Sequence, residues 1–577
     1  MALMAGIAAA APSPAAANSS AEYFRAKISD SVVPGLLSNA DKAYYTDLFR
    51  AIDAEQWDKV EKLLQERSDG PLHQVARAEY YTAATSPKVS AEQIAKWFED
   101  GALLPQAEQL ARLGLKRGLE AVPELPREQS LVRQPGSSKR ILPRSVDDGT
   151  MPESISSSIL EHIRGDDPDG ARLLLDGIDA NLSPEARAEW RQRVAWSYYI
   201  ENQDAPALAM AQSVADGSGA WVAEGAWVAG LAAWRLGDCE TSANAFARSA
   251  AQSTNIELTS AAHYWASRAL TRCRKPGEAD KHLAAAARFD ETLYGMLALD
   301  ARGQDIPAGH TAPDFDNADW QRLRNEPNVR VAVELSEIGR SDLADEVLRH
   351  QARIGNPSEY SSLSRLAREL GMPQTQLWMA YHAPYGSKSE PALRYPTARW
   401  TPTTGWHVDP ALAFAHALQE SNFRTKALSP AKARGLMQIT PITVREHAGR
   451  LEMNARYVNL NDPEVNLAFG QRNLEMLRDS AATRGQLPKI MAAYNAGLAP
   501  ISRWNSEIND QNDPLLYMES IPYWETRAYV AIVMRNYWMY ERQAGVESPS
   551  RLSLAQGSWP GFPEASGSNS VHLSRKN

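Results

Sequence analysis

The sequence predicts an all-α fold in which a superhelical α-solenoid of helix hairpins precedes a second, separate helical domain. Three observations predict it. Apolar residues recur at helical spacing through most of the first 385 residues. Two hairpin-like segments repeat each other at a fixed offset, and no segment shows convincing strand alternation. The chain has 577 residues, which exceeds the roughly 250–300 residues that one hydrophobic core supports.

The helix hairpins can be followed along the chain. Residues 43–70 predict two helices with a break around Asp53–Gln56. Residues 226–253 resemble residues 261–289 at an offset of 34, and residues 340–371 continue the pattern. This period is typical of tetratricopeptide-like helix pairs. One pair cannot bury its own apolar stripe, so we expect the pairs to stack into a curved solenoid.

The only two cysteines, Cys239 and Cys273, occupy equivalent positions of the repeat. Equivalent positions in stacked helices lie about 8–10 Å apart, whereas a disulfide spans at most about 7 Å between Cα atoms. Both cysteines fall at turns, where the spacing is looser, so the sequence leaves a disulfide open. We expect two small buried thiols instead.

Two connections rich in Pro, Ser and Gly interrupt the helices, near residues 121–157 and at residues 383–405. The start of the chain is short, Ala-rich and uncharged, as in a signal peptide, although the usual leading Lys or Arg is missing. We therefore expect export to the periplasm. The expected segments are a possibly truncated signal peptide at 1–17, a U-shaped superhelical domain at 18–310, a helical linker domain at 311–390, a second domain at 391–545 and a mobile tail at 546–577.

Composition excludes several classes of function. The formal net charge of −9 argues against a nucleic-acid-binding protein. Residues 391–545 hold 17 Lys and Arg against 14 Asp and Glu, a net charge of +3, so the remainder carries −12. No apolar run reaches the roughly 18 residues of a membrane span. No metal-ligand spacing occurs, and we expect neither a metal nor a cofactor.

Glu420 is the first candidate for chemistry. Residues 407–423 predict a helix that begins at Asp409 and Pro410, is lined with Ala, Leu and Phe, and ends near Glu420. The negative end of the helix dipole and the apolar neighbours both raise the pKa of such a carboxyl group. A carboxylic acid that keeps its proton near neutral pH can protonate a leaving group. The alternative is a solvated acid at a helix end.

Five motifs follow one another in order: ALQESNF (417–423), ALSPAKARGLMQI (427–439), NLNDPEVNLAFGQRNL (459–474), AAYNAG (492–497) and ESIPYWETRAYV (519–530). Together they resemble the catalytic domain of soluble lytic transglycosylases of the goose-lysozyme-like superfamily, over about residues 412–530. The order of solenoid, linker and lysozyme-like α domain also resembles the large, ring-shaped periplasmic members of family 1. These enzymes cut peptidoglycan.

The resemblance implies that Glu420 is the single acid/base. It implies four substrate-binding residues, Ser429, Gln438, Tyr494 and Glu525. It also implies four supporting residues: Ser421 at the helix end, Gly435 for a tight backbone approach, Met437 as wall, and Asn495 in a local turn that Gly497 lets the chain leave.

Some of these residues have alternative interpretations. Ser429 could be a plain N-cap before Pro430, and Glu525 could form a structural pair with Arg527. We expect Arg527 and Tyr529 to brace Glu525. Thr440 stands where the family often has a methionine lining the cleft, so that part of the cleft differs.

The implied reaction needs one acid. Ordinary glycosidases use a second carboxylate as nucleophile or base, and none follows Glu420 before Glu446. By resemblance, Glu420 protonates the oxygen between N-acetylmuramic acid and N-acetylglucosamine. It then takes the proton of the muramic C6 hydroxyl as that oxygen closes onto C1, which leaves a 1,6-anhydromuramic acid end.

Two other functions stay open, a hydrolysing muramidase of the same fold and a non-catalytic cell-wall scaffold. The expected partners are peptidoglycan glycan strands, with cell-wall synthesis or secretion-system proteins as candidates, and we expect a monomer. The solenoid could guide a glycan strand or dock proteins. Trp400 and Trp406, just before the second domain, could stack on sugars, but we expect them to pack at the domain junction.

Overall fold

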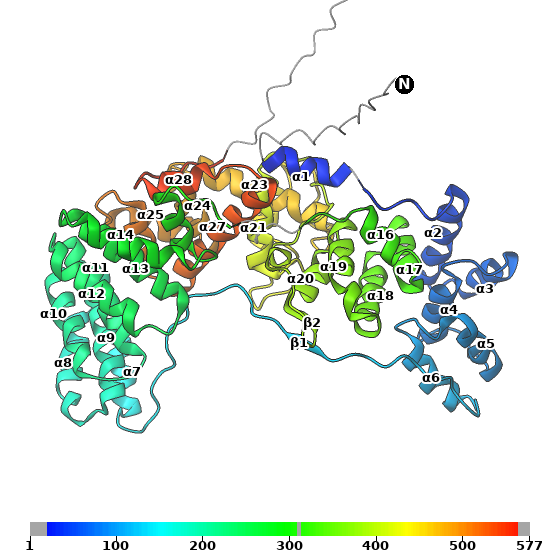
Figure 1. Cartoon of the computed structure of the whole chain (residues 1–577), viewed down its shortest axis with the longest axis horizontal. Coiled ribbons are helices and arrows are strands. Elements are labelled where there is room, and N and C mark those ends of the chain that lie inside the picture. The colour runs from blue at the N-terminus through cyan, green and yellow to red at the C-terminus, as the bar shows by residue number, and fades with distance from the viewer. Residues whose placement is uncertain (1–19, 30, 308–312, 564–577) are drawn as a thin grey trace, which may run out of the picture.

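The computed structural model describes residues 20–29, 31–307 and 313–563. Within these residues it has 28 α-helices and one sheet of two short strands, so the predicted all-α fold is confirmed. The helices form an elongated arch (Figure 1). Two large hydrophobic cores hold the arch together, and neither is built from one continuous stretch of chain.

The first core joins the early helices to a group that follows much later in the sequence. These two groups form one end of the arch and its middle (Figure 1). The helices of this first core are α2 (Asn39–Asp53), α3 (Trp57–Glu66), α4 (His73–Thr82), α5 (Ala91–Gly101), α6 (Ala107–Lys116), α16 (Asn317–Leu323), α17 (Pro327–Glu337), α18 (Ser341–Ile354), α19 (Tyr360–Glu369) and α20 (Pro373–Tyr381). The predicted break between α2 and α3 is present.

The second core joins the middle helices to the C-terminal ones at the other end of the arch. The middle helices are α7 (Glu153–Arg164), α8 (Pro168–Asp176), α9 (Pro184–Ile200), α10 (Asp204–Ser213), α11 (Trp221–Arg235), α12 (Cys239–Gln252), α13 (Ile256–Arg272), α14 (Pro276–Ala287) and α15 (Leu293–Ala301). They stack as consecutive antiparallel neighbours, as the repeated hairpin pattern predicted.

The C-terminal helices surround the long helix α27. They are α21 (Pro410–Ser421), α22 (Pro441–His447), α23 (Pro463–Asp479), α24 (Leu487–Ala496), α25 (Leu498–Glu507), α26 (Pro514–Glu519), α27 (Trp524–Ala544) and α28 (Pro549–Ala555). Buried polar contacts fix them to the middle helices: Tyr294 donates to Glu519 at 2.6 Å, and Arg535 pairs with Glu257 at 3.1 Å. No described helix is long and apolar enough to cross a membrane.

The first described helix, α1 (Ser20–Ser29), packs on α21 and α27 rather than on its neighbours in sequence. Phe24 is buried there against Phe414 and Tyr540. The Ser20 hydroxyl donates to Asp409, the residue that caps α21. The beginning of the described chain therefore completes the C-terminal part of the molecule. The expected signal peptide at 1–17 lies outside the described residues.

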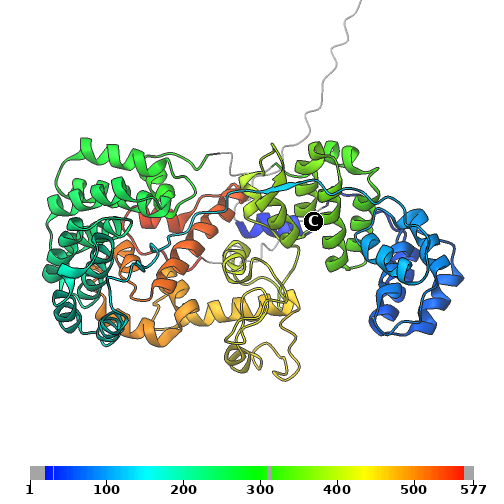
Figure 2. The same ribbon diagram turned by 90° about the horizontal axis from the view of Figure 1, so that it is seen from below.

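The connection between α6 and α7 crosses the molecule as an extended segment (Figure 2). Its strand β1 (Leu131–Arg133) pairs antiparallel with β2 (His382–Pro384). The expectation of no strands was wrong at this point, because three residues are too few to show alternation. The Gln129 N–H also donates to the Arg353 carbonyl at 2.8 Å, so this connection is an ordered tie between the two cores.

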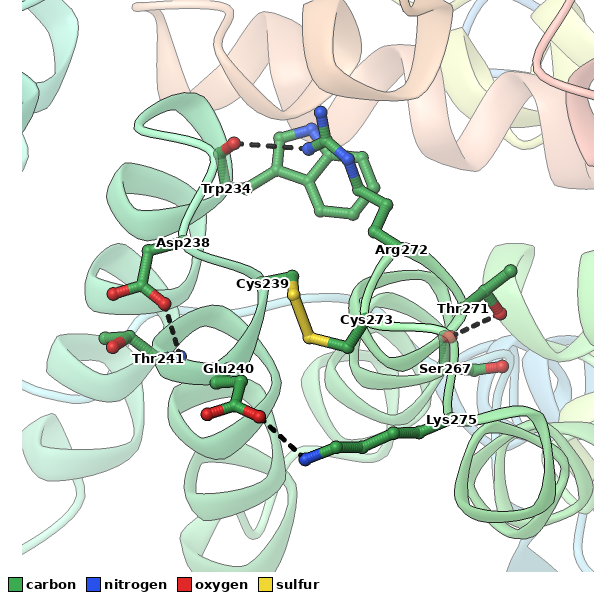
Figure 3. The surroundings of a disulfide bond; sticks show 10 residues. All are labelled: Trp234, Asp238, Cys239, Glu240, Thr241, Ser267, Thr271, Arg272, Cys273 and Lys275. Atoms are coloured by element: carbon green, nitrogen blue, oxygen red, sulfur yellow. Dashed lines mark hydrogen bonds and ion pairs between the residues drawn. A yellow bond between two sulfur atoms is a disulfide. The ribbon is translucent and has the colours of Figure 1, made fainter.

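Cys239 and Cys273 form a disulfide, and the expectation of two separate thiols was wrong (Figure 3). Their Cα atoms are 5.6 Å apart, closer than the spacing of the helix axes. Cys239 is the first residue of α12 and Cys273 follows the last residue of α13, so the two turns meet at the same end of the antiparallel pair. An ion pair of 2.9 Å between Lys275 and Glu240 lies beside the bond.

Part of the expected mobile tail at 546–577 is ordered. Helix α28 buries Leu554, and Trp559 packs edge-on against Tyr517. A short bridge pairs Gln486 with Gly561. The expectation was wrong for this part because a few apolar residues anchor a segment whose composition is otherwise that of a linker. The other expected domain boundaries stay a prediction.

Candidate active site

Glu420 lies in the last turn of α21. Asp409 caps the start of this helix, and Asn422 ends it in the left-handed conformation with φ 52°. The carboxyl group is largely enclosed, and this burial, together with the negative charge of Glu525, raises its pKa to about 7. The predicted shift in pKa therefore has burial as its main cause. A group with this pKa can both donate and accept a proton near neutral pH.

Tyr529 on α27 holds the carboxyl group in place. Its hydroxyl donates a hydrogen bond of 2.7 Å to Oε1 of Glu420. This bond favours the ionised carboxylate and so opposes the rise in pKa. We had expected Tyr529 to brace Glu525, and this was wrong, because its hydroxyl bonds to Glu420.

His416, one turn before Glu420 on α21, contacts the same hydroxyl. Its Nδ1 lies 2.8 Å from the Tyr529 oxygen. When Glu420 is ionised, the tyrosine proton is directed at it and Nδ1 of His416 is the donor to the Tyr529 oxygen. Burial lowers the pKa of His416 to about 3, which keeps the ring neutral, and the buried Nε2 has no hydrogen-bond partner. The structure thus contains a relay of hydrogen bonds, from His416 to Tyr529 to Glu420.

The turn at residues 434–438 faces the end of α21 and is fixed by two buried polar side chains. The Ser421 hydroxyl donates to the Leu436 carbonyl at 2.8 Å. Asn466 on α23 accepts from the Met437 N–H at 2.8 Å and donates to two carbonyl groups. The Ser421 hydroxyl therefore ties the end of α21 to this turn, and its role in the reaction stays a prediction.

Gly435 is required at this turn for two reasons. Its φ is +75°, a value that other residues rarely adopt. A Cβ atom there would lie 2.2 Å from both the Asn466 amide nitrogen and the Leu460 carbonyl oxygen. The close approach seen here is to the protein's own Asn466 and Leu460, and the expected role of Gly435 toward the substrate stays a prediction.

The remaining predicted residues of the turn lie as follows. Met437 is fully buried, with its sulfur against Gly470, and its expected place in the wall of a sugar cleft stays a prediction. Gln438 is half-buried, with φ 48°, and its amide donates to the Gly435 carbonyl at 2.9 Å. The Tyr494 hydroxyl donates to the Met437 carbonyl at 2.8 Å. The Tyr494 ring is parallel to that of Tyr529, with ring centroids 6.5 Å apart.

Ser429 does not cap a helix. Its hydroxyl accepts from the Ala433 N–H at 3.0 Å, and its own N–H donates to the Ala433 carbonyl. These bonds close the small turn between Leu428 and Arg434, which pair in a bridge. The N-cap interpretation was therefore wrong.

Glu525 is exposed, in the first turn of α27, and forms no structural pair with Arg527. Arg527 is buried on another side of α27, against Trp196 and Trp524. Both the structural-pair interpretation and the expected brace were wrong. Asn495 accepts a hydrogen bond of 2.6 Å from Thr526, so it joins α24 to α27.

Two further expectations concern the edges of the site. Thr440 caps α22 by accepting from the Thr443 N–H, and it is half-buried. Trp406 is 9% exposed and packs edge-on against Phe414 of α21, within the second expected domain, so packing at the domain junction stays a prediction. Trp400 is half-buried against the same core.

A cavity of about 730 Å³ opens beside the segment that follows Glu420. Residues 424–428 form one wall, and α6, α18 and residues 125–128 form the others. Lys426 pairs with Asp342 at 2.7 Å across it. In the described residues, no group of His, Cys, Asp or Glu has an arrangement that could hold a metal ion.

Residues 401–516 match the family model of the transglycosylase SLT domain. This segment holds the helix of Glu420, the turn of Gly435 and the helix of Tyr494. It belongs to the transglycosylase SLT domain family. The resemblance proposed from the five motifs is thereby confirmed for this part of the chain.

Curated relatives of this chain are named as soluble lytic murein transglycosylases. The chain is 32% identical to the soluble lytic murein transglycosylase of Escherichia coli K12 over 157 residues. This aligned segment covers 27% of this chain and 24% of that protein. It is 28% identical over 284 residues to a putative soluble lytic murein transglycosylase of Haemophilus influenzae, 47% of this chain and 46% of that protein. By sequence, the chain thus spans less than half the length of these relatives.

Solved structures extend the likeness beyond the SLT domain. The structure of the 70 kDa soluble lytic transglycosylase of Escherichia coli matches 90% of this chain and 99% of that one, with a TM-score of 0.52 and 19% identity. Its complex with bulgecin A matches 91% of this chain and 100% of that one, with a TM-score of 0.57. At 19% identity the likeness shows the fold alone, over about nine-tenths of this chain.

Sequence reasoning missed two residues of the site, His416 and Asn466. A signal existed for His416, since a lone polar residue four positions before Glu420 in an apolar helix faces the same side as the acid. Asn466 lies within a motif that we had identified, but its contact is to a turn in a different, earlier motif, and local spacing could not reveal it.

Proposed function

We propose that this chain is a lytic transglycosylase that cleaves the β-1,4 bond between N-acetylmuramic acid and N-acetylglucosamine in peptidoglycan, with Glu420 as the single acid/base. The observation that carries the proposal is the enclosed carboxyl group of Glu420, with its pKa at about 7 and Tyr529 bonded to it. The SLT domain family and the names of the relatives support the same substrate.

The proposed reaction uses one carboxyl group twice. Protonated Glu420 gives its proton to the bridging oxygen as the bond from that oxygen to C1 of the muramic residue breaks, and this proton stays on the leaving hydroxyl. The oxygen of the C6 hydroxyl then bonds to C1, and the proton of that hydroxyl passes to Glu420. No water is consumed, and the product is a 1,6-anhydromuramic acid end. Because the hydrogen bond from Tyr529 strengthens when Glu420 ionises, it stabilises the intermediate stage.

The predicted substrate-binding residues have roles in this proposal. Ser429, Gln438, Tyr494 and Glu525 bind the glycan around Glu420. Gly435, Met437, Asn495 and Ser421 hold the surrounding backbone. His416 positions Tyr529 and exchanges no proton, since burial keeps it neutral.

Hydrolysis by a muramidase is the second candidate, because one observation favours it. Glu525 is the second carboxylate whose charge acts on the pKa of Glu420. A second carboxylate near the acid is what a hydrolysing glycosidase uses to activate water or to attack C1. Glu525 is exposed, which leaves Glu420 as the acid in either reaction.

We further propose the periplasm as the location and glycan strands as the ligand of the arch. The disulfide between Cys239 and Cys273 supports an oxidising compartment. The cavity of about 730 Å³ between residues 424–428 and helices α6 and α18 supports binding of a long substrate near the segment that follows Glu420. The net charge of the chain, −9, does not favour nucleic acid.

Digestion of purified peptidoglycan sacculi tests the proposal. The muropeptides released by the full chain are identified by mass spectrometry, and we expect anhydro ends that lack one water relative to reducing ends. Glu420→Gln should lower the rate about 10²–10⁴-fold. Reducing ends would instead establish the muramidase, and undiminished cleavage by Glu420→Gln would refute both proposals.

A further inference from the structure

A second pocket, of about 150 Å³, lies between the middle helices and the start of α27. Helices α7, α9 and α11 form one wall, and residues 522–527 form the other. Its lining is mainly apolar and includes four indole rings, those of Trp196, Trp221, Trp227 and Trp524. Nothing in the proposed reaction uses this pocket.

Arg527 is the feature of this pocket that the fold does not explain. The residue is 8% exposed, and its guanidinium group stacks 4.0 Å from the Trp196 ring centroid and 5.0 Å from that of Trp524. Among the described residues, it has no ion pair or side-chain hydrogen bond, and its Nε is buried without a partner. A buried guanidinium group without a hydrogen-bond partner is costly.

Two other arginines near this pocket, Arg140 and Arg193, are paired with carboxylates. Arg140 bonds to Glu224 and to Glu519, at 3.1 Å each. Arg193, which also lines the pocket, pairs with Glu189 at 2.8 Å. The nearby carboxylates are therefore already used. Burial and the repulsion from Arg140 lower the pKa of Arg527 to about 10. Glu519 and Glu224, which also lines the pocket, act in the opposite direction and offset this only in part, because both are bonded to Arg140.

We propose that this pocket binds the carboxylate of a small molecule with an apolar body, such as the C-terminal residue of a short peptide, and that Arg527 is its anchor. A planar guanidinium group accepts a carboxylate through two parallel hydrogen bonds. The indole walls suit a methyl-sized side chain. The pocket is smaller than the roughly 300–1,000 Å³ of sites for whole drug-sized ligands, so it takes a terminal residue rather than a sugar chain.

Two sources can supply such a carboxylate, a free peptide or a peptide attached to the glycan. The second source rests on the proposed function. The place of Arg527 in the chain fits it, since Arg527 lies on α27 between Glu525, whose charge acts on the pKa of Glu420, and Tyr529, which bonds to Glu420. A strand held at Glu420 would have this pocket on the other side of the same helix.

The test uses N-acetyl-D-alanyl-D-alanine and its C-terminal amide as probes of the full chain, by calorimetry and by quenching of tryptophan fluorescence. The two probes differ only in the carboxylate. We expect saturable binding of the acid and at least about 10-fold weaker binding of the amide, the equivalent of one charge-assisted hydrogen bond. Equal binding of both probes, or no saturable binding of the acid, would overturn the proposal without any variant.

Variants locate the site. Arg527→Gln should reduce binding of the acid to the level of the amide, and Arg527→Lys should give an intermediate affinity. The matched control is Arg268→Gln, because Arg268 also stacks on two indole rings, those of Trp234 and Trp265, but lies outside this pocket. Circular dichroism and Tm confirm folding. Unchanged binding in folded Arg527→Gln would refute the assignment.

The source is tested with the inactive Glu420→Gln chain, so that no bond is cut. Tighter binding of a disaccharide-linked peptide than of the free peptide would identify the glycan-attached source. Equal binding would identify the free peptide, and both results support the carboxylate site. Because these assays measure binding alone, their failure leaves the proposed reaction untouched.

Discussion

The hydroxyl of Tyr529 donates a hydrogen bond of 2.7 Å to Oε1 of Glu420, across the interface of α27 and α21. The same hydroxyl lies 2.8 Å from Nδ1 of His416, which precedes Glu420 by one helical turn. Burial raises the pKa of the acid, and this bond moderates the rise. Tyr529 and His416 can therefore shift the pKa of Glu420, although neither of them contacts the leaving group.

Removing the hydroxyl should change the pH dependence of the proposed reaction. In Tyr529→Phe the carboxylate loses its stabilising donor, so the pKa of Glu420 rises further above about 7. Protonated Glu420 is the acid, so activity falls as pH rises through this pKa. We expect that fall to move about one pH unit upward. The measurement is kcat/KM against pH on soluble murein oligosaccharides.

Tyr494→Phe is the matched control for this experiment. The Tyr494 hydroxyl donates to the Met437 carbonyl and not to Glu420, although the two tyrosine rings are parallel neighbours. Loss of the Tyr494 hydroxyl should lower the rate and leave unchanged the pH at which activity falls. An equal shift in both variants would mean that the bond from Tyr529 does not set the pKa.

His416 should act through Tyr529 alone. Replacement by Leu removes the donor to the Tyr529 oxygen, and we expect the fall in activity to move upward by less than in Tyr529→Phe. His416→Asn, which keeps a donor, should restore part of the shift. In a Tyr529→Phe background, His416→Leu should add nothing. An additive shift in the double variant would show that His416 acts on Glu420 independently.

The stability of the protein should depend on pH through Glu420. The folded pKa, about 7, is raised above the ordinary 4.5, so the folded state binds the proton more tightly. Glu420 therefore costs no stability below pH 4.5 and destabilises the fold increasingly up to pH 7 and above. Glu420→Gln removes this cost, which is at most about 3 kcal/mol from the difference in pKa. Its Tm should exceed that of the unchanged chain clearly at pH 8 and by little at pH 4.5.

Gly435→Ala should disrupt the turn opposite Glu420. The new Cβ would lie 2.2 Å from the Asn466 amide and from the Leu460 carbonyl, at a φ of +75°. We expect a loss of stability above about 3 kcal/mol, from overpacking and backbone strain together, with loss of activity. Gly449→Ala is the control, since its Cβ would meet nothing within 4 Å, and it should change Tm by about 1 °C or less. A similar small effect at Gly435 would contradict the geometry.

Breaking the disulfide should destabilise the solenoid. The bond closes a loop of 34 residues, for which loss of chain entropy in the unfolded state gives about 3–4 kcal/mol. The double variant Cys239→Ser with Cys273→Ser should lower Tm in a calorimetric scan. Dithiothreitol should lower the Tm of the unchanged chain by a similar amount and leave the double variant unaffected. An unchanged Tm in both experiments would show that the two turns are held by packing alone.

Local patterns in the sequence predicted the helices well. The break after Asp53 and the repeated hairpin pattern both correspond to helix pairs in the structure. The helix that ends at Glu420 begins at Asp409, as its capping residues indicated. These features depend on neighbours within a few residues, which is the range over which spacing and capping act.

Contacts between distant segments could not be predicted in the same way. The helix spacing was the wrong guide for Cys239 and Cys273, because turns approach more closely than helix axes. Arg527 followed Glu525 closely enough to suggest a pair, yet it lies against Trp196, which belongs to a much earlier part of the chain. The residues next to a side chain in the sequence do not predict which of several distant apolar or charged residues that side chain contacts.

The interleaved cores have a consequence for synthesis. Ser20 meets Asp409, which leaves the ribosome 389 residues later. The earliest helices likewise share their interior with α16–α20, and the middle ones with the C-terminus. Neither compact half can be finished while the nascent chain is short. Folding of this protein must therefore be largely a post-translational event, with unburied apolar stripes to protect until the last helices emerge.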